Sequence, residues 1–217
     1  QKVGEEKFKL FLTKIGILGE INFDISEVGK PIEFNWGKCP LATASFGHGI
    51  TTTLLQLSKA YSIIVNGGYK IHPTLIKKNK NKETNQILDK NVSEKILPIL
   101  RKIVSTKEGT ASLANVDGFE VGGKTGTAQK SVSGGYSKKK INTFLSVFPT
   151  SKPKFVLAIM LDEPKTNKDY IYNYRDGSNI KYKGTPFNTA GWTTVEVTGQ
   201  IIEKIGPILA TKYNEIN

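Results

Sequence analysis

Four stretches of the chain share the apolar spacing of an amphipathic helix: residues 3–15, 54–65, 91–104 and 195–205. Gly16 follows the first stretch and Asn66-Gly67-Gly68 follows the second, which is typical of helix C-termini. Before the second stretch, Thr53 and Gln56 have the spacing of a capping box, in which each side chain bonds the other residue's backbone N–H. The sequence therefore predicts four helices, each with one buried stripe.

Prolines and glycines interrupt the helical part of the chain. Pro98 lies too far inside the third stretch to be a first-turn proline, so we expect either a later helix start or a kink there. Residues 19–40 show no period, and Gly29-Lys30-Pro31 and Lys38-Cys39-Pro40 predict irregular loops.

Beyond Gly109 the pattern changes from helix to strand. Three segments are rich in β-branched and aromatic residues: 119–121, 141–148 and 155–161. The short connection 149–153 predicts that the last two are antiparallel neighbours, and residues 131–140 are expected to form a turn region rich in Gly, Ser and Lys. Helices followed by strands and a last helix predict an α+β fold, with helices packed on an antiparallel sheet.

The composition is that of a globular protein. Its 217 residues fit one domain, or one domain plus a fragment, and 38% apolar residues suffice for a core, which excludes a disordered chain. No apolar run approaches the roughly 18 residues of a membrane-spanning helix. With one cysteine, Cys39, and two histidines, His48 and His72, we expect no intramolecular disulfide, no metal site and no cofactor.

The net charge of +12 raises the question of nucleic-acid binding. Only Arg101 and Arg175 among the 31 cationic residues are arginines, whereas phosphate and base recognition favours the planar fork of arginine. Tyrosines between residues 170 and 182 could stack on bases, but we interpret this segment as a solvated insertion. We therefore predict no nucleic-acid partner, and a basic binding module remains an alternative.

Gly118–Thr125 matches the phosphate-loop pattern G-x-x-x-x-G-K-[ST], and the apolar run ending at Asp162-Glu163 mimics a strand with a magnesium-binding acid. The mechanism behind this pattern requires a strand before Gly118 and a helix beginning at Lys124, whose amides bind phosphate. The segment before Gly118 is short and polar, and residues 126–135 would break a helix. A P-loop NTPase that uses Gly118–Thr125 is therefore the alternative function.

A second interpretation takes residues 121–129 as one extended strand at the rim of a cleft. The Lys124 ammonium and the hydroxyls of Thr125 and Thr127 would then hold a carboxylate, while exposed strand amides stabilise an oxyanion. Gly126 would let a substrate backbone approach the strand, which a side chain would obstruct. The triplet Lys-Thr-Gly alone is a weak signal, so its weight depends on the wider sequence.

Sequence blocks along essentially the whole chain resemble, in order, the transpeptidase domain of penicillin-binding proteins. The blocks are Ala44-Ser45-Phe46-Gly47-His48-Gly49-Ile50, residues 53–57, Ala60-Tyr61, Asn66-Gly67-Gly68, Pro73, Gly109-Thr110-Ala111, residues 122–129, Leu161-Asp162-Glu163-Pro164 and Thr189-Ala190-Gly191-Trp192. The last block is most similar to the class B, division-type transpeptidases. The resemblance implies an incomplete serine transpeptidase/β-lactamase-like fold, of which this chain is a C-terminal portion.

The resemblance also implies a function, that of a peptidoglycan D,D-transpeptidase, which cross-links stem peptides through an acyl-serine intermediate and binds penicillin. It implies catalytic roles for Lys124, as the cation near the nucleophile, and for Thr127, whose N–H would be an oxyanion donor. Lys124, Thr125, Gly126 and Thr127 would bind the substrate. The implied partners are D-Ala-D-Ala stem peptides, β-lactams and membrane proteins of the division machinery, and the implied location is the periplasmic face of the bacterial inner membrane.

Two further motifs of that family are absent from the sequence. The nucleophile motif Ser-x-x-Lys has three literal matches, at Ser137, Ser151 and Ser178, each in a polar turn or insertion where no buried helix is expected. Neither Ser-x-Asn nor Tyr-x-Asn occurs. Both motifs precede the segment equivalent to residues 2–4 in the family, so we expect this sequence to begin just after the second motif and to be inactive alone.

The expected organisation is one C-terminal part of a transpeptidase domain, residues 1–217. It would comprise a mainly helical part (1–117), the sheet strands with the Lys-Thr-Gly motif (118–164), a polar insertion (165–185) and a C-terminal helix (186–217). Trp36 and Trp192 are expected to be packing residues rather than ligand platforms.

Overall fold

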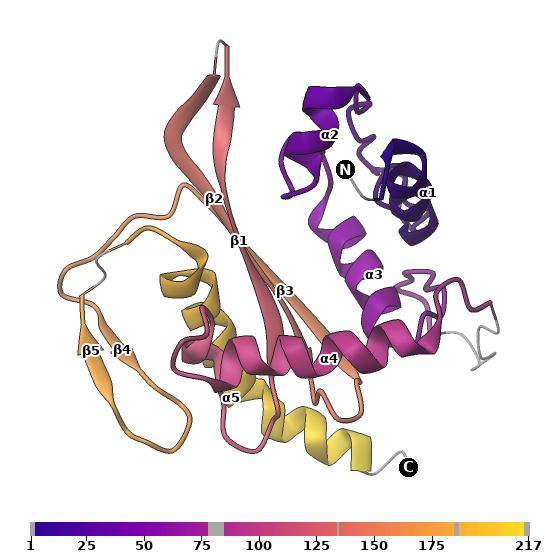
Figure 1. Ribbon diagram of the computed structural model, residues 1–217. Coiled ribbons are helices and arrows are strands. Elements are labelled where there is room, and N and C mark those ends of the chain that lie inside the picture. Colours follow the sequence, from indigo (N-terminus) through magenta and orange to yellow (C-terminus); the bar gives the residue numbers. More distant parts are fainter. Residues whose placement is uncertain (1–2, 78–84, 134, 185–186, 215–217) are drawn as a thin grey trace. The chain divides into compact units, whose positions relative to one another are not determined.

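The computed structural model describes residues 3–77, 85–133, 135–184 and 187–214 (Figure 1). The chain divides into two compact units, residues 1–94 and 95–217. The first contains α1 (Glu5–Ile15), α2 (Lys38–Ala44), α3 (Leu54–Val65) and the beginning of α4 (Lys90–Ser105). The second contains the remainder of α4, a three-stranded sheet, a two-stranded hairpin and α5 (Thr194–Asn214).

The ends of α1 and α3 confirm the sequence prediction. α1 ends at Gly16, which adopts a left-handed backbone conformation with φ 81° and closes the helix by hydrogen bonds to its last turn. At the start of α3, the Thr53 hydroxyl accepts the Gln56 N–H and the Gln56 side chain accepts the Thr53 N–H, which completes the capping box. α4 and α5 likewise cover the third and fourth stretches predicted as helices.

Pro40 and Pro98 both lie inside helices. Residues 38–44, whose beginning was expected in an irregular loop, form the short helix α2. Pro40 lies in its first turn, where backbone N–H groups have no partner within the helix, so a missing N–H is tolerated. α4 begins at Lys90, so of the two alternatives expected for Pro98, a later helix start or a kink, the later start is wrong, and that proline lies inside the helix.

The first unit has an apolar core of its own. Its buried side chains come from α1, α3 and the residues after α1: Leu12, Ile15, Ile17, Ala60 and Ile63. Trp36 packs edge-on against Phe8 and Phe34 at the margin of this core, which confirms that it is a packing residue. Ser93 in α4 accepts the Gly67 N–H, so α4 begins against the end of α3.

The second unit is built on an antiparallel sheet of β1 (Gly122–Val132), β2 (Gly135–Phe148) and β3 (Phe155–Asp162), in the order β1-β2-β3. Its antiparallel pairing confirms the prediction for β2 and β3. Residues 119–121 do not form the strand that was expected, because Glu120 has a positive φ of 45° and turns the chain before β1. Residues 135–140, expected in a turn, extend β2 instead.

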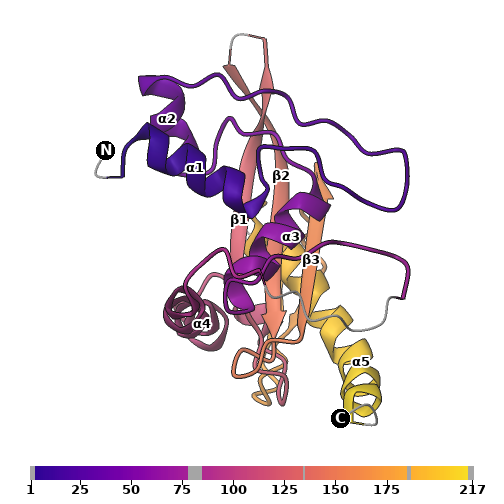
Figure 2. The ribbon, with the colours of Figure 1, turned by 90° about the vertical axis from the view of Figure 1, so that its right-hand side faces the viewer.

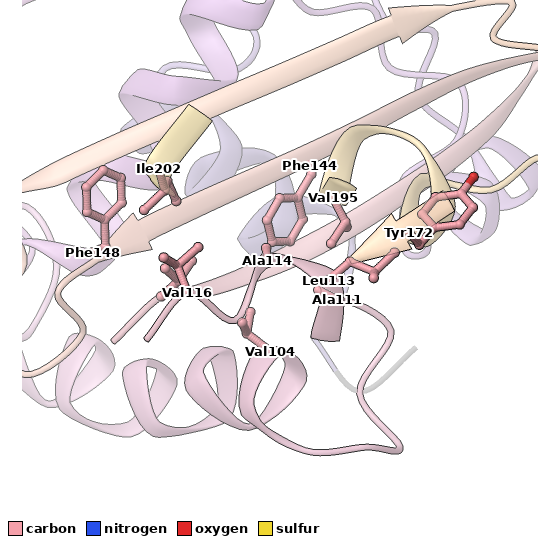
Figure 3. Close-up of a cluster of buried hydrophobic side chains, with 11 residues drawn as sticks. Val104, Ala111, Leu113, Ala114, Val116, Phe144, Phe148, Tyr172, Val195 and Ile202 are labelled. Carbon is pink, nitrogen blue, oxygen red and sulfur yellow. The ribbon is translucent and has the colours of Figure 1, made fainter. Parts of the chain in front are cut away.

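α5 covers one face of this sheet and forms the core of the second unit with it (Figures 2 and 3). Val195 and Ile202 of α5 are buried with Phe144 and Phe148 of β2. The short 3-10 helix η1 (Ser112–Ala114) closes this core from the side of α4. Each such apolar side chain stabilises the folded state by about 1.5–3 kcal/mol through its removal from water. This burial determines which face of the sheet packs against α5.

The hairpin of β4 (Ile171–Asn173) and β5 (Lys181–Lys183) is anchored to α5. Tyr172 is buried, and its ring meets Trp192 edge-on at a centroid distance of 5.1 Å, which confirms Trp192 as a packing residue. Arg175 is buried as well and pairs with Glu196 of α5. The expectation of a solvated insertion is therefore wrong for Tyr172 and Arg175; residue 185, at the end of that segment, lies outside the described residues.

Candidate functional site

Residues 124–127, the Lys-Thr-Gly-Thr segment, lie in β1 at the free edge of the three-stranded sheet. Residues paired across antiparallel strands have their side chains on the same face. Thr125 pairs with Phe144 and Thr127 pairs with Asn142, so both threonines lie on the face that α5 covers. The alternate positions 124 and 126 project to the opposite face.

The Lys124 side chain, although it starts on the opposite face, bends back to the backbone of β1. Its Nζ donates to the carbonyl oxygen of Thr125 over 2.8 Å, and the residue is exposed. An ammonium group has three donors, so this bond leaves two of them for a ligand. Lys124 therefore provides a positive charge at the strand edge, beside Thr125.

Each of the two threonine hydroxyls contacts another segment of the second unit. Thr125 Oγ1 lies 3.1 Å from Thr110 Oγ1, and either oxygen can donate. Thr127 Oγ1 accepts the backbone N–H of Ala190 over 3.0 Å, at the start of the 3-10 helix η2 (Ala190–Trp192). The blocks 109–111 and 189–192, which stood out in the sequence without a role, thus contact the Lys-Thr-Gly-Thr segment.

Two glycines of β1 differ in what surrounds them. A Cβ on Gly123 would lie 2.4 Å from the Phe144 ring and 2.7 Å from the Leu145 carbonyl oxygen, so the packing of the sheet requires a glycine there. A Cβ on Gly126 would meet only Thr143, at 3.9 Å, which is an ordinary contact. The protein's own packing therefore does not require a glycine at position 126, and the space over it is open to a ligand.

Asn142, to which the sequence assigned no role, is completely buried opposite Thr127. Its Nδ2 donates to Asn188 Oδ1 and to Thr193 Oγ1, both over 2.9 Å. These bonds join β2 to residues on either side of η2. A polar residue at an inward-facing position of an apolar strand is the signal that could have identified it, because buried amides require partners.

The phosphate-loop interpretation of Gly118–Thr125 is wrong. Lys124 lies inside β1, so the helix that would have to begin at this residue is not formed. The strand that the phosphate-loop pattern requires before Gly118 is not formed either, since residues 115–118 follow η1 as irregular backbone and a turn. The second interpretation, an extended strand over residues 121–129, is confirmed from residue 122 onward.

The acidic pair at the end of β3, which mimicked a magnesium-binding acid, is neutralised by lysines. Asp162 and Glu163 both lie 2.7 Å from Lys130 Nζ, and Glu163 lies 3.1 Å from Lys139 Nζ. Hydrogen bonds from Lys130 and Lys139 hold the pKa of the Glu163 carboxyl below its ordinary value. These ion pairs therefore connect β1, at Lys130, and β2, at Lys139, to the end of β3.

None of the three serines in Ser-x-x-Lys matches lies in a helix, as the sequence predicted, but Ser137, which was expected in a turn, lies in a strand. Ser137 lies within β2, Ser151 in the connection to β3, and Ser178 between β4 and β5. A serine nucleophile on a buried helix is therefore not among them.

The described ranges of the chain hold no cluster of three or more His, Cys, Asp or Glu side chains suited to a metal ion. No helix among residues 3–77, 85–133, 135–184 and 187–214 has both the length and the apolar character needed to cross a membrane. The groups that the candidate site offers are the ammonium, hydroxyl and backbone groups of β1 and its neighbours.

Two solved structures with a similar fold are those of penicillin-binding proteins. The chain aligns with the TP domain of penicillin-binding protein 3 from Burkholderia pseudomallei at a TM-score of 0.75 and 25% identity, covering 94% of this chain and 57% of that one. It aligns in fold with penicillin-binding protein 3 from Mycobacterium tuberculosis, solved with aztreonam, at a TM-score of 0.74 and 23% identity, covering 95% and 48%. The predicted α+β fold class is confirmed.

The sequence comparisons identify the family. Residues 1–179 match the penicillin binding protein transpeptidase domain, and this chain belongs to that family. It is similar to the "Probable peptidoglycan D,D-transpeptidase FtsI" of Caulobacter vibrioides, at 29% identity over 98% of this chain and 36% of that protein. The peptidoglycan D,D-transpeptidase FtsI of Buchnera aphidicola is 33% identical over 73% of this chain and 28% of its own length. The chain thus spans about a third of the length of these relatives.

Proposed function

We propose that this chain forms the Lys-Thr-Gly side of the active site of a class B, division-type peptidoglycan D,D-transpeptidase. The observation that carries the proposal is the arrangement of groups along β1. The Lys124 ammonium and two threonine hydroxyls lie close to Gly126, and the packing of the protein does not fill the space where a side chain at position 126 would lie. Membership of the family and the names of the relatives support the reaction class.

The substrate proposed for this edge is a D-Ala-D-Ala stem peptide, and β-lactams are proposed as its inhibitors. Lys124 attracts the terminal carboxylate, and the hydroxyls of Thr125 and Thr127 donate to it in charge-assisted hydrogen bonds. Gly126 admits the substrate backbone alongside β1, since a side chain there would occupy the open space.

The Thr127 N–H is proposed as one donor to the oxyanion that forms during acyl transfer. In an antiparallel strand, the backbone polar groups of alternate residues point to the same edge. The Thr125 carbonyl oxygen accepts from Lys124 beside the free edge, which favours the same direction for the N–H of Thr127. A donor of this kind lowers the reaction barrier by about 3–4 kcal/mol.

The serine nucleophile of the reaction is proposed to lie outside these 217 residues. Its hydroxyl oxygen would attack the carbonyl carbon of the D-Ala-D-Ala bond, the proton would pass to the departing D-Ala amine, and the acyl group would then move to the amine of a neighbouring stem. Division-machinery membrane proteins as partners, and the periplasmic face of the inner membrane as the location, are proposed on the likeness to the FtsI relatives.

Fluorescent penicillin tests the proposal on two samples, the 217-residue chain and the longest polypeptide that its gene encodes. We expect covalent label on the second alone, with Lys124→Ala lowering the labelling rate about 10²–10³-fold. Lys138→Ala is the matched control, because Lys138 is also an exposed lysine of the β1–β2 hairpin.

The outcomes separate the parts of the proposal. No label on the longer polypeptide would overturn the function. Label on the 217-residue chain mapped to Ser137, Ser151 or Ser178 would overturn the assignment of the nucleophile, and equal losses in Lys124→Ala and Lys138→Ala would overturn the site.

A further inference from the structure

We propose that Asn142 is a positioning residue that fixes the Thr127 hydroxyl as a hydrogen-bond donor to a carboxylate-bearing substrate. The proposal rests on the function proposed above and adds to it a residue outside the Lys-Thr-Gly-Thr segment. Its starting point is the contact between Thr127 Oγ1 and the backbone N–H of Ala190, at 3.0 Å.

A threonine hydroxyl can accept or donate, and its partner decides which. The Ala190 N–H can only donate, so Thr127 Oγ1 accepts it and the hydroxyl proton must point elsewhere. Thr127 is exposed, so that proton is available to a ligand at the strand edge. A carboxylate only accepts, and it therefore meets a hydroxyl already oriented to donate.

Asn142 holds the segment that carries Ala190. One Nδ2 hydrogen bond goes to Thr193 Oγ1, which in turn donates to the carbonyl oxygen of Thr189 over 2.9 Å. The other goes to the side chain of Asn188. The side-chain amide of Asn142 thus forms hydrogen bonds to the chain on both sides of Ala190, at Asn188 and at Thr193.

The same segment also reaches the other threonine of the site. A Cβ on Gly191 would lie 2.6 Å from the Thr110 carbonyl oxygen, so η2 packs directly on the backbone of Thr110. The Thr110 hydroxyl lies 3.1 Å from that of Thr125. A displacement of η2 would therefore disturb both hydroxyls at the strand edge.

The burial of Asn142 indicates that its amide acts chiefly as a donor. The residue is completely buried, and within the described parts of the chain its Oδ1 has no hydrogen-bond partner. Leucine has the same branched arrangement of four side-chain heavy atoms, is larger than asparagine and has no polar group, so Asn142→Leu removes both donors without opening a cavity. Asn142→Ser keeps one side-chain donor, the hydroxyl, and changes the polarity of this position less than Asn142→Leu does.

The experiment compares benzylpenicillin with its methyl ester, which lacks the negative charge, on the longest polypeptide that the gene encodes. A residue that only stabilises the fold would lower acylation by both compounds alike. We expect Asn142→Leu to lower acylation by benzylpenicillin about tenfold and to leave the slower reaction of the ester unchanged. In a Thr127→Val background the same substitution should cause no further loss, because the hydroxyl that it positions is gone.

A control and a second measurement complete the test. Ser146→Ala removes another buried side-chain hydrogen bond of β2, from Ser146 Oγ to the Leu157 carbonyl oxygen, and should leave the ratio of the two rates unchanged. In the 217-residue chain, hydrogen exchange of the Ala190 amide should be faster in Asn142→Leu than in Ser146→Ala. If Asn142→Leu does not fold, Asn142→Ser must show a smaller loss of acylation by benzylpenicillin, again with the reaction of the ester unchanged.

Equal losses for the acid and the ester, additive losses with Thr127→Val, or an unchanged Ala190 exchange rate would each overturn the positioning role. A longer polypeptide that benzylpenicillin does not acylate would instead overturn the proposed function, and the exchange measurement would still decide whether Asn142 holds Ala190.

Discussion

Arg175 and Glu196 form an ion pair that is almost completely removed from water: Arg175 Nη2 lies 2.8 Å from Glu196 Oε1, and their side chains are 5% and 4% exposed. Arg175 also donates to the carbonyl oxygen of Leu113 in η1. Tyr170 and Gln200 donate to the same carboxylate oxygen of Glu196. The pair therefore joins the β4–β5 segment, η1 and α5 at one buried point.

Removing Glu196 is expected to destabilise the protein strongly, because the buried Arg175 charge would then keep only the exposed Glu203 as its ionic partner. Glu196→Ala should lower the free energy of unfolding by about 3–5 kcal/mol, measured by urea denaturation of the 217-residue chain. Glu203→Ala is the control: Glu203 also bonds Arg175, at 3.0 Å, but its side chain is 58% exposed. The control should lose less than about 1 kcal/mol, and equal losses would contradict the burial argument.

The two glycines of β1 give a prediction that separates folding from ligand binding. Gly123→Ala should lower the free energy of unfolding by about 1–3 kcal/mol, because its Cβ would overlap the Phe144 ring and the Leu145 carbonyl oxygen. Gly126→Ala should change it by less than about 0.5 kcal/mol, since its Cβ would make one ordinary contact. Chemical denaturation of both variants measures the difference.

In the longest polypeptide that the gene encodes, Gly126→Ala should nevertheless lower the rate of acylation by penicillin, since the added methyl group occupies the open space at the strand edge. Unchanged acylation together with unchanged stability would argue that no substrate backbone passes over position 126.

The helix ends could be predicted from the sequence because the interactions that fix them are local. Gly16 and the pair Thr53 and Gln56 act within one turn of the chain, so spacing alone identifies them. The burial of Tyr172 and Arg175 could not be predicted in this way. Their partners Trp192 and Glu196 lie about twenty residues further along, and no short-range pattern links the two segments.

The candidate site shows the same division between local and long-range information. The motif at residues 124–127 could be singled out by spacing, and its extended backbone agrees with that interpretation. The contacts of its hydroxyls with Thr110 and Ala190 depend on how the sheet and α5 pack. Spacing also favoured a phosphate loop, and only the context of strand and helix argued against it.

The ion-pair cluster at the end of β3 predicts a dependence of stability on pH. The pKa of Glu163 in the folded protein is lowered from its ordinary value of 4.5 by hydrogen bonds from Lys130 and Lys139. A lowered pKa means that the ionised carboxylate stabilises the fold above pH 4.5, and that this contribution is lost as the pH falls through the folded value. Glu163→Gln should therefore lower the melting temperature at pH 7 and should have little effect at pH 2.

Thermal unfolding of the 217-residue chain and of Glu163→Gln between pH 7 and pH 2 measures this difference. Because the cluster is exposed to solvent, 1 M salt should reduce the difference at pH 7 as well. A difference that persists undiminished at pH 2 would show that the substitution acts through packing rather than charge.

The capping box of α3 gives the last prediction, on the first unit. Thr53→Ala removes the oxygen that accepts the Gln56 N–H and should lower the stability of α3 by about 1 kcal/mol, whereas Thr53→Ser, which keeps that oxygen, should restore most of it. Ser58→Ala is the control within the helix, because the Ser58 hydroxyl only adds a second bond to the Leu54 carbonyl. Hydrogen exchange of the α3 amides measures the stability of this helix separately from that of the second unit. Exchange that is equally fast in Thr53→Ala and Ser58→Ala would mean that the packing of α3, and not its cap, limits its opening.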